Sequence, residues 1–350
     1  MPEQIWFVKT AAGAVICRCF GDGKRVILPA VIAGLPVIAI ADHCFAKDRP
    51  SFMNGRTVYV SCPDPDGAGL YETTGQIDTD TLEEVSFSET GNHAGIPEIC
   101  TMDLEEIELP ESMEEIGAYA FYGCRSLRRI YFPASVRRMG RGVFVAVNRV
   151  RELEFEAKEF PVIPSILSDV LDELSNEVRV ILKKDGEVFC DLVFPEYYEE
   201  SIENTPARII EIKYQGSGFQ YRQCLRGQNL DLKLYDSLRN TAAVLEDPQT
   251  VARLCLGRLR YPCSLSAEDA KDYVSLLAGE EESAKEIVFN EQNMQDLKLL
   301  WKMEFFTEER LDSWITYASE KKDAEAVSFL MDCRRSRYGG RRRKGLVVSG

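Results

Sequence analysis

Apolar residues recur at intervals of 22 or 23 along residues 82–155, and this repetition is the clearest pattern in the chain. Leu104, Ile107 and Leu109 each have an apolar counterpart 23 residues later, and a proline follows the last position in both copies. The alternation from Ile107 onward predicts a short strand with one buried face. A unit of this length buries its apolar side only against its neighbours, so the repetition predicts a β-solenoid. The strand-like units begin at Leu82, Leu104, Leu127 and Val150.

The full unit Leu104–Ser126 reads LEEIELPESMEEIGAYAFYGCRS. It resembles the repeat of the BspA-like leucine-rich repeat family of bacteria, which reads approximately L-x-x-I-x-[IL]-P-x-S-V-x-x-I-G-x-x-A-F-x-G-C-x-S. A second full unit runs over residues 127–146, and a divergent opening unit runs from Val26 to Phe45. The resemblance covers about residues 20–157 and implies a leucine-rich repeat solenoid, but it supplies no activity.

Five residues of the full units are expected to shape each coil. Gly117 and Gly140 supply the bend back, while Phe121, Phe144 and the repeat's own Cys124 fill the core. The segments that depart from the repeat are residues 46–81, in which residues 62–69 predict a surface loop, and residues 91–101.

Polar residues between the buried positions should form columns on the exposed face of the sheet if adjacent units pair as parallel strands. Most of these positions carry charge, so the face is densely charged. The expected columns are Glu83, Glu105, Arg128 and Arg151; Glu84, Glu106, Arg129 and Glu152; and Ser86, Glu108, Tyr131 and Glu154.

This face has two interpretations. It can be a solvated surface with cross-strand ion pairs, such as Glu105 with Arg128, which contribute little stability. Alternatively it binds a protein around Tyr131, because tyrosine and arginine are enriched where partners bind tightly. The candidate protein-binding residues are Glu105, Glu106, Glu108, Arg128, Arg129, Tyr131 and Arg151.

The repeat ends after Ala157, and a mixed segment follows. Apolar residues over 166–174 have helical spacing. Two strand-like runs, Val178–Leu182 and Glu187–Phe194, flank an Asp-Gly pair and predict a hairpin. We expect residues 195–200 to begin a helix, because Pro195 is suited to a first helical turn.

Helix formers dominate from Asp236 onward. Residues 267–333 resemble ankyrin-type helical hairpins, although the threonine-proline-leucine-histidine opening is absent. The expected helices are Thr241–Arg260, Ala267–Leu277, Glu281–Asn290, Met294–Met303, Thr307–Glu320 and Asp323–Cys333.

The predicted fold class is therefore α+β. The expected domains are a leucine-rich repeat solenoid over 1–160, a mixed connector with a hairpin over 161–235, an all-helical ankyrin-like region over 236–335, and a basic flexible tail over 336–350.

The composition is that of an ordinary globular protein: 350 residues, 45% of them hydrophobic and 28% charged. The net charge of −15 disfavours nucleic acid as the main partner, because neutralising phosphates needs a basic face. Seven basic residues lie between Arg334 and Lys344, which leaves residues 1–333 at −22. This tail is a solvated end, a nucleic-acid contact or a neutraliser of an acidic patch on its own chain.

The first 19 residues lack the pattern of a signal peptide, and no window approaches the roughly 18–20 apolar residues that span a bilayer. Eleven cysteines, an odd number, fit reduced thiols better than a disulfide framework. We therefore expect a cytoplasmic protein without a membrane partner.

Side chains suited to catalysis or metal binding are few. The two histidines are His43, at a core-flanking repeat position, and His93, in a Gly/Asn loop. The pair Cys17-x-Cys19 lacks the second pair that a zinc site needs, so packing explains it better. We expect no catalytic residue, no metal and no cofactor.

One glycine-rich turn supports an alternative function. Gly216, Ser217 and Gly218 can present backbone N–H groups to an anion near Arg222, and with Tyr221 they can form a small-molecule or catalytic module within residues 205–235. The spacing matches no nucleotide-binding motif, so a plain turn is the simpler interpretation.

The sequence thus favours a non-enzymatic scaffold for protein–protein interaction, using the solenoid sheet and the helical end. It identifies neither the protein partner nor the oligomeric state.

Overall fold

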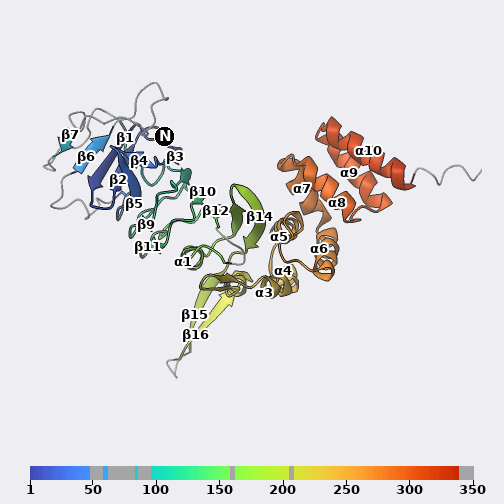
Figure 1. Ribbon diagram of the computed structural model, residues 1–350. Coiled ribbons are helices and arrows are strands. Elements are labelled where there is room, and N and C mark those ends of the chain that lie inside the picture. Colours follow the sequence, from blue (N-terminus) through green and yellow to red (C-terminus); the bar gives the residue numbers. More distant parts are fainter. Residues whose placement is uncertain (48–57, 62–82, 86–95, 158–161, 205–208, 339–350) are drawn as a thin grey trace, which may run out of the picture. The chain divides into compact units, whose positions relative to one another are not determined.

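The computed structural model describes residues 1–47, 58–61, 83–85, 96–157, 162–204 and 209–338 (Figure 1). The chain divides into two compact units. The first unit comprises Met1–Phe189 and Phe194–Asp231, and the second comprises Cys190–Val193 and Leu232–Gly350. The first contains a β-solenoid and the second is largely helical, which confirms the predicted α+β class. The finer four-part division of the chain stays a prediction.

Parallel strands, one from each coil, build the main sheet of the solenoid. Their alternate residues are buried in register, so each coil extends one continuous apolar core. The strands, in spatial order, are β3 (Arg25–Ile27), β8 (Glu106–Glu108), β10 (Arg129–Phe132), β12 (Glu152–Glu156) and β13 (Val178–Lys184). The aligned core residues are Val26, Ile107, Ile130, Leu153 and Val180.

A second sheet forms the other side of the coils. Its parallel strands are β2 (Ala14–Phe20), β5 (Leu35–Ile40), β9 (Glu115–Ile116) and β11 (Arg138–Met139). Antiparallel partners extend or flank it: β1 (Gln4–Lys9) beside β2, β6 (Val58–Ser61) beside β1, β7 (Glu83–Val85) beside β6, and β4 (Val31–Ile32) beside β5.

The prediction that residues 82–87 contribute a strand to the main sheet is wrong. β7 pairs antiparallel with β6, and the neighbour of β8 is β3, from the divergent opening unit. Glu83 and Glu84 therefore join no column, and Ser86 lies outside the described residues. Both segments alternate apolar and polar residues, so their spacing could not show which one pairs with β8.

Backbone hydrogen bonds join each coil to the next at the turn that carries the core phenylalanine. The His43 N–H donates to the Ala118 carbonyl at 2.9 Å, and the Tyr119 N–H donates to the Arg141 carbonyl at 3.0 Å. The rings of Phe45, Phe121 and Phe144 stack along the same turns, with centroids 5.5 and 5.8 Å apart.

The last turn of this ladder ends on a side chain. The N–H groups of Gly142 and Phe144 donate to the two carboxylate oxygens of Glu173, at 2.7 and 2.9 Å. Glu173 is the final residue of α1 (Leu167–Glu173), the short helix expected from the spacing of residues 166–174. It replaces the carbonyls that a further coil would supply, so these two N–H groups are not left without acceptors.

Gly117 and Gly140 act differently from the bend that the sequence predicts. Neither has a positive φ. A Cβ at Gly117 would lie 2.4 Å from the carbonyl carbon of Ala41, and one at Gly140 would lie 2.4 Å from the nitrogen of Ala118. These glycines therefore let neighbouring coils approach closely.

The predicted hairpin is confirmed, but the helix expected after it is wrong. β13 and β14 (Glu187–Phe194) meet at Asp185 and Gly186, whose positive φ values of 54° and 80° suit a tight hairpin turn. Residues 198–204 then form strand β15, because seven pairs with β16 outweigh the local preference for a helix after Pro195.

The remaining elements of the first unit are short. They are β15 (Tyr198–Asn204), β16 (Ile209–Gln215), α2 (Gly218–Arg222), β17 (Leu225–Arg226) and β18 (Asn229–Leu230).

The helices of the second unit match the expected series, except that an unexpected helix over residues 232–237 precedes it and the expected helix Thr241–Arg260 is divided. Residues 241–260 form two helices, because Asp247 accepts hydrogen bonds from the N–H groups of Gln249 and Thr250 and Pro248 begins a new first turn. The helices are α3 (Leu232–Ser237), α4 (Arg239–Leu245), α5 (Pro248–Arg260), α6 (Ala267–Gly279), α7 (Glu281–Asn290), α8 (Met294–Lys302), α9 (Glu308–Glu320) and α10 (Ala324–Tyr338). Their ankyrin-like character stays a prediction.

The start of the basic segment belongs to α10. Arg334 forms an ion pair with Asp312 of α9 at 2.8 Å, and Arg337 lies over the ring of Trp301 at 3.9 Å. The rest of the expected tail, residues 339–350, lies outside the described residues.

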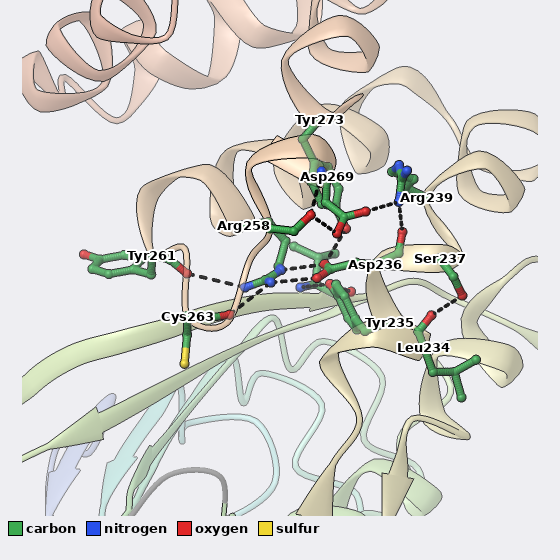
Figure 2. Close-up of polar contacts among 12 residues, drawn as sticks. Leu234, Tyr235, Asp236, Ser237, Arg239, Arg258, Tyr261, Cys263, Asp269 and Tyr273 are labelled. Carbon is green, nitrogen blue, oxygen red and sulfur yellow. Dashed lines mark hydrogen bonds and ion pairs between the residues drawn. The ribbon is translucent and has the colours of Figure 1, made fainter. Parts of the chain in front are cut away.

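A buried ionic cluster joins the first helices of the second unit (Figure 2). Arg258 in α5 donates to both carboxylate oxygens of Asp236 in α3, at 2.8 and 2.9 Å, and the Tyr273 hydroxyl in α6 donates to the same carboxylate at 2.8 Å. Burial lowers the pKa of Arg258, but the hydrogen bonds to Asp236 and its charge outweigh burial and raise that pKa. This guanidinium therefore stays charged in the interior.

Replacing Glu173 with alanine should destabilise the solenoid. The substitution leaves the Gly142 and Phe144 N–H groups without their carboxylate acceptor, so the free energy of unfolding should fall by about 1–3 kcal/mol. Urea denaturation measures this change. Asp169→Ala, on the exposed side of the same helix, should cost less than about 0.5 kcal/mol, and an equal loss in both variants would contradict the capping role.

Asp236→Asn should destabilise the second unit more strongly, because it leaves Arg258 charged and buried without its counter-ion. The expected loss is about 3–5 kcal/mol, measured by thermal or urea unfolding. Asp272→Asn, which removes a half-exposed partner of Arg239, is the matched control and should cost less than about 1 kcal/mol.

Candidate protein-binding face of the solenoid sheet

The structure brings together the central residues of the predicted face. Arg129 in β10 lies between Glu106 in β8 and Glu152 in β12. Tyr131, two residues further along, lies beside Glu108 on β8. The parallel register therefore produces the second and third expected columns over these strands.

The first column lies just before these strands. The Arg128 N–H donates to the Glu105 carbonyl at 2.7 Å, and the Arg151 N–H donates to the Arg128 carbonyl at 2.8 Å. The Glu105 side chain, however, pairs with Lys24 at 3.1 Å, so the expected Glu105–Arg128 ion pair is wrong. Arg128 is exposed, and no carboxylate in the described part of the chain pairs with its guanidinium.

Glu154 is the centre of an ionic network on this face. Its side chain is only 4% exposed and accepts hydrogen bonds from Arg129 and Lys183. Arg129 also pairs with Glu152 at 3.1 Å, and Arg179 reaches Glu152 at 3.3 Å. Burial raises the pKa of Glu154, but the hydrogen bonds from its two basic partners outweigh burial and lower it. The centre of the face is thus internally paired.

Tyr131 borders a hollow beside this network. Its hydroxyl donates to a carboxylate oxygen of Glu111 at 3.0 Å. Burial, together with that hydrogen bond, raises the pKa of Tyr131, so the phenol remains a donor at neutral pH. The hollow has a volume of about 600 Å³ and is lined by Glu111, Tyr131, Ala134, Glu156, Ala157, Asp185 and Gly186.

Consecutive coils carry opposite charge, a pattern that the apolar repeat does not reveal. Residues 98–124 contain eight acidic residues and no Lys or Arg, whereas residues 125–151 contain eight arginines and no Asp or Glu. Residues 152–177 again carry eight acidic residues, against one lysine. The basic coil is therefore stacked between two acidic ones, and Arg138–Glu115 and Arg129–Glu152 are ion pairs across the two boundaries. Counting charge per repeat would have found this pattern.

The glycine-rich turn places Arg222 away from solvent. Ser217 is buried, and a Cβ at Gly218 would lie 2.1 Å from the Pro195 carbonyl oxygen. The Arg222 guanidinium donates to backbone carbonyls, and burial lowers its pKa to about 10. The accepting carbonyls belong to Leu171, Leu174, Asn176, Pro195 and Gly218. These contacts support a structural role for Arg222.

The remaining candidates lie in packed positions. His43 stacks on Tyr119, with ring centroids 5.1 Å apart, and Cys17, Cys19 and Cys124 are buried. His93 lies outside the described residues. Within the described ranges, no three His, Cys, Asp or Glu side chains are grouped so that they could hold a metal ion. None of the helices described is both long and apolar enough to cross a membrane.

One comparison with known proteins matches part of the solenoid to a repeat family. Residues 79–172 match, in six copies, the family described as "BspA type Leucine rich repeat region". Over these residues the solenoid is similar to that repeat family. The similarity covers 94 of the 350 residues and does not extend to the helical second unit.

Other comparisons add little. A crystal structure of a T. pallidum leucine-rich repeat protein is 18% identical to this chain, and the match covers 42% of this chain and 67% of that one. Its TM-score is 0.20, so that likeness carries no argument. No curated protein matches the chain significantly.

Glu154→Gln should reduce the stability of the repeat array in a pH-dependent way. Because the folded-state pKa of Glu154 is lowered, its carboxylate contributes fully above the ordinary glutamate value of about 4.3. That contribution is lost as the pH falls through the lower folded-state pKa. The difference in urea midpoint between wild type and variant should be large at pH 7 and shrink below about pH 4.

Glu106→Gln is the control, since Glu106 is half-exposed and pairs with Arg25 only at 3.7 Å. Its effect should be small at both pH values. A difference for Glu154→Gln that stays constant with pH would show that lost packing, not lost charge, causes it.

Proposed function

We propose that the chain is a non-enzymatic protein-interaction scaffold that binds its partner on the exposed face of β8, β10 and β12. The observation that carries this proposal is the contrast between neighbouring arginines. Arg129 forms ion pairs with Glu152 and Glu154. Arg128, the residue before it, is exposed, and its guanidinium has no carboxylate partner among the described residues. The face thus combines a fixed ionic network with a guanidinium that can pair with a partner.

The architecture supports this role. Solenoids present extended rigid surfaces, and partners bind along them rather than in enclosed pockets. Tyr131 adds an aromatic ring beside the hollow, and Tyr and Arg are the residues that most often dominate binding energy. We infer a partner that offers an acidic side chain to Arg128 and an apolar or aromatic contact to Tyr131. Glu105, Glu106, Glu108 and Arg151 would form the rim of this site.

The helical second unit would supply another interaction surface, as stacked helical hairpins do in repeat proteins. A cytoplasmic location belongs to this proposal. Every cysteine in the described part of the chain is a free thiol, which suits a reducing compartment. The contacts of Arg222 do not favour the anion-binding alternative, so we develop no second function.

Quantitative affinity capture tests the binding face. The immobilised full chain is incubated with lysate, and the recovery of each retained protein is compared for wild type, Tyr131→Ala and Arg128→Glu. Loss of a central contact typically costs about 2 kcal/mol or more, so recovery of a specific partner should fall at least about 10-fold.

Arg138→Glu provides a matched charge reversal on the second sheet, at an exposed residue of β11. Proteins retained by wild type and by this control, but lost with both face variants, would support the proposal. Unchanged recovery with both Tyr131→Ala and Arg128→Glu would show that the partner does not bind at the sheet face.

A further inference from the structure

A band of exposed residues crosses two neighbouring coils, between the turn that carries the core phenylalanine and the main sheet. In the first coil, Tyr122, Arg125 and Arg128 are exposed, and in the second coil the residues 23 positions later are exposed as well. We call this band the shoulder. Its members are Tyr122, Arg125 and Arg128 with their counterparts Val145, Asn148 and Arg151.

Backbone hydrogen bonds hold the two rows of the shoulder in register. The Gly123 N–H donates to the Val145 carbonyl at 3.0 Å, and the Arg151 N–H donates to the Arg128 carbonyl at 2.8 Å. Neighbouring parallel strands lie about 4.8 Å apart, so Arg151 follows Arg128 at about this spacing along the stack. The backbone that presents both arginines is therefore fixed before any partner binds.

Arginines without a carboxylate partner concentrate positive charge here. Arg125, Arg128 and the neighbouring exposed Arg149 form no ion pair within the ranges that the structure describes. Arg151 donates to the backbone carbonyl of Glu177 at 3.3 Å, and no described carboxylate pairs with it. Like charges on neighbouring strands repel, so an anion bound between them would relieve a cost that the free array bears.

Acidic coils limit the width of this basic surface. Glu105 occupies the position of Arg128 in the coil before, and Glu177 lies beside Arg151 in the segment after. A polyanion long enough to cross several coils, such as a nucleic acid, would meet these acidic neighbours and be repelled. The shoulder therefore suits one compact anion of high charge.

A phosphate monoester has these properties. It carries about −1.5 to −2 charge at pH 7 and three acceptor oxygens. Guanidinium groups bind phosphate through paired, charge-assisted hydrogen bonds. Arg128 and Arg151 can both reach one phosphate from neighbouring coils, with Arg125 and Arg149 in the adjoining turns. A carboxylate, with a single charge, would leave most of this positive charge unneutralised.

The other end of the shoulder indicates that the phosphate belongs to a protein. Tyr122 is 37% exposed and Val145 46%, although both are large apolar side chains. A free phosphate ion bound at the arginines would leave them in water. A peptide that continues from a phosphorylated residue would cover them, and tyrosine and arginine together are typical of protein-binding sites.

We propose that the shoulder binds a phosphorylated serine, threonine or tyrosine of the partner protein. The phosphate lies between Arg128 and Arg151, and the adjoining peptide packs on Tyr122 and Val145. This inference rests on the proposed protein-binding role of the adjacent sheet face and specifies the chemistry that the partner offers to Arg128.

Pools of synthetic peptides, offered to the immobilised full chain, test the chemistry. Each pool has phosphoserine, phosphothreonine, phosphotyrosine, serine or glutamate at its centre, between randomised residues. At least one phosphorylated pool should be retained about 10-fold more than the serine and glutamate pools. Arg128→Gln and Arg151→Gln should each lower that retention about 10-fold or more, because each removes charge-assisted hydrogen bonds to the phosphate.

Arg137→Gln is the matched control, since it removes the same charge from an exposed arginine of the same coil outside the shoulder. Its retention should equal that of wild type, and the melting temperature establishes that every variant is folded. Equal retention of the phosphorylated and glutamate pools would overturn the proposal. So would an equal loss in all three variants, no loss with Arg128→Gln and Arg151→Gln, or stronger binding of an oligothymidylate than of the phosphorylated pool.

Phosphatase treatment of the lysate separates this inference from the proposed function. Recovery of the specific partner should fall at least about 10-fold after treatment, because its phosphate contacts are lost. Undiminished recovery that is still abolished by Tyr131→Ala and Arg128→Glu would overturn phosphate recognition and leave the protein-binding face standing. Retention of a phosphorylated pool by a chain that captures no protein would instead contradict the proposed function.

Discussion

The solenoid depends on one constraint: the backbone N–H groups at each coil's turn find their acceptors in the next coil. His43 donates to Ala118, and Tyr119 donates to Arg141, so no coil completes its own hydrogen bonding. Unpaired N–H groups in a buried position are costly, so the array needs a defined end. The carboxylate of Glu173 provides that end, and the helix that carries it belongs to the closure of the array.

The same stacking that builds the core also determines which charges can bind a partner. The parallel register places Arg129 and Lys183 around Glu154. Both donate hydrogen bonds to its carboxylate, and these bonds link neighbouring strands. Arg128 lies just before the strand and pairs with no carboxylate in the described ranges. A binding role therefore depends less on how many charges the face carries than on which of them the fold leaves unneutralised.

The repeat period predicted most of the solenoid, because buried residues in stacked coils must recur at equivalent positions. The strands around Ile107, Ile130 and Leu153 and the phenylalanine stack follow from it. Local sequence patterns did not predict strand pairing where more than one partner was available. β8 pairs with β3 and not with residues 82–87. Residues 198–204 pair with β16 and do not form the expected helix.

Single residues that act once leave no periodic signal. Glu173 looks like any surface glutamate of a short helix, yet it closes the array. At the candidate face, the columns were predictable, but the partners of individual charges were not. The long side chain of Glu105 can approach either Lys24 or Arg128, and in the folded protein it pairs with Lys24. The sequence alone does not distinguish these two partners.

The alternation of acidic and basic coils constrains how this array can change length. Copying or deleting one coil would stack eight like charges on eight others, at a spacing where cross-strand repulsion acts directly. Gain or loss of an acidic and a basic coil together keeps every boundary complementary. The heritable unit of this solenoid is therefore the oppositely charged pair of coils, about 46 residues by doubling the 23-residue repeat, and related arrays should differ by even numbers of coils.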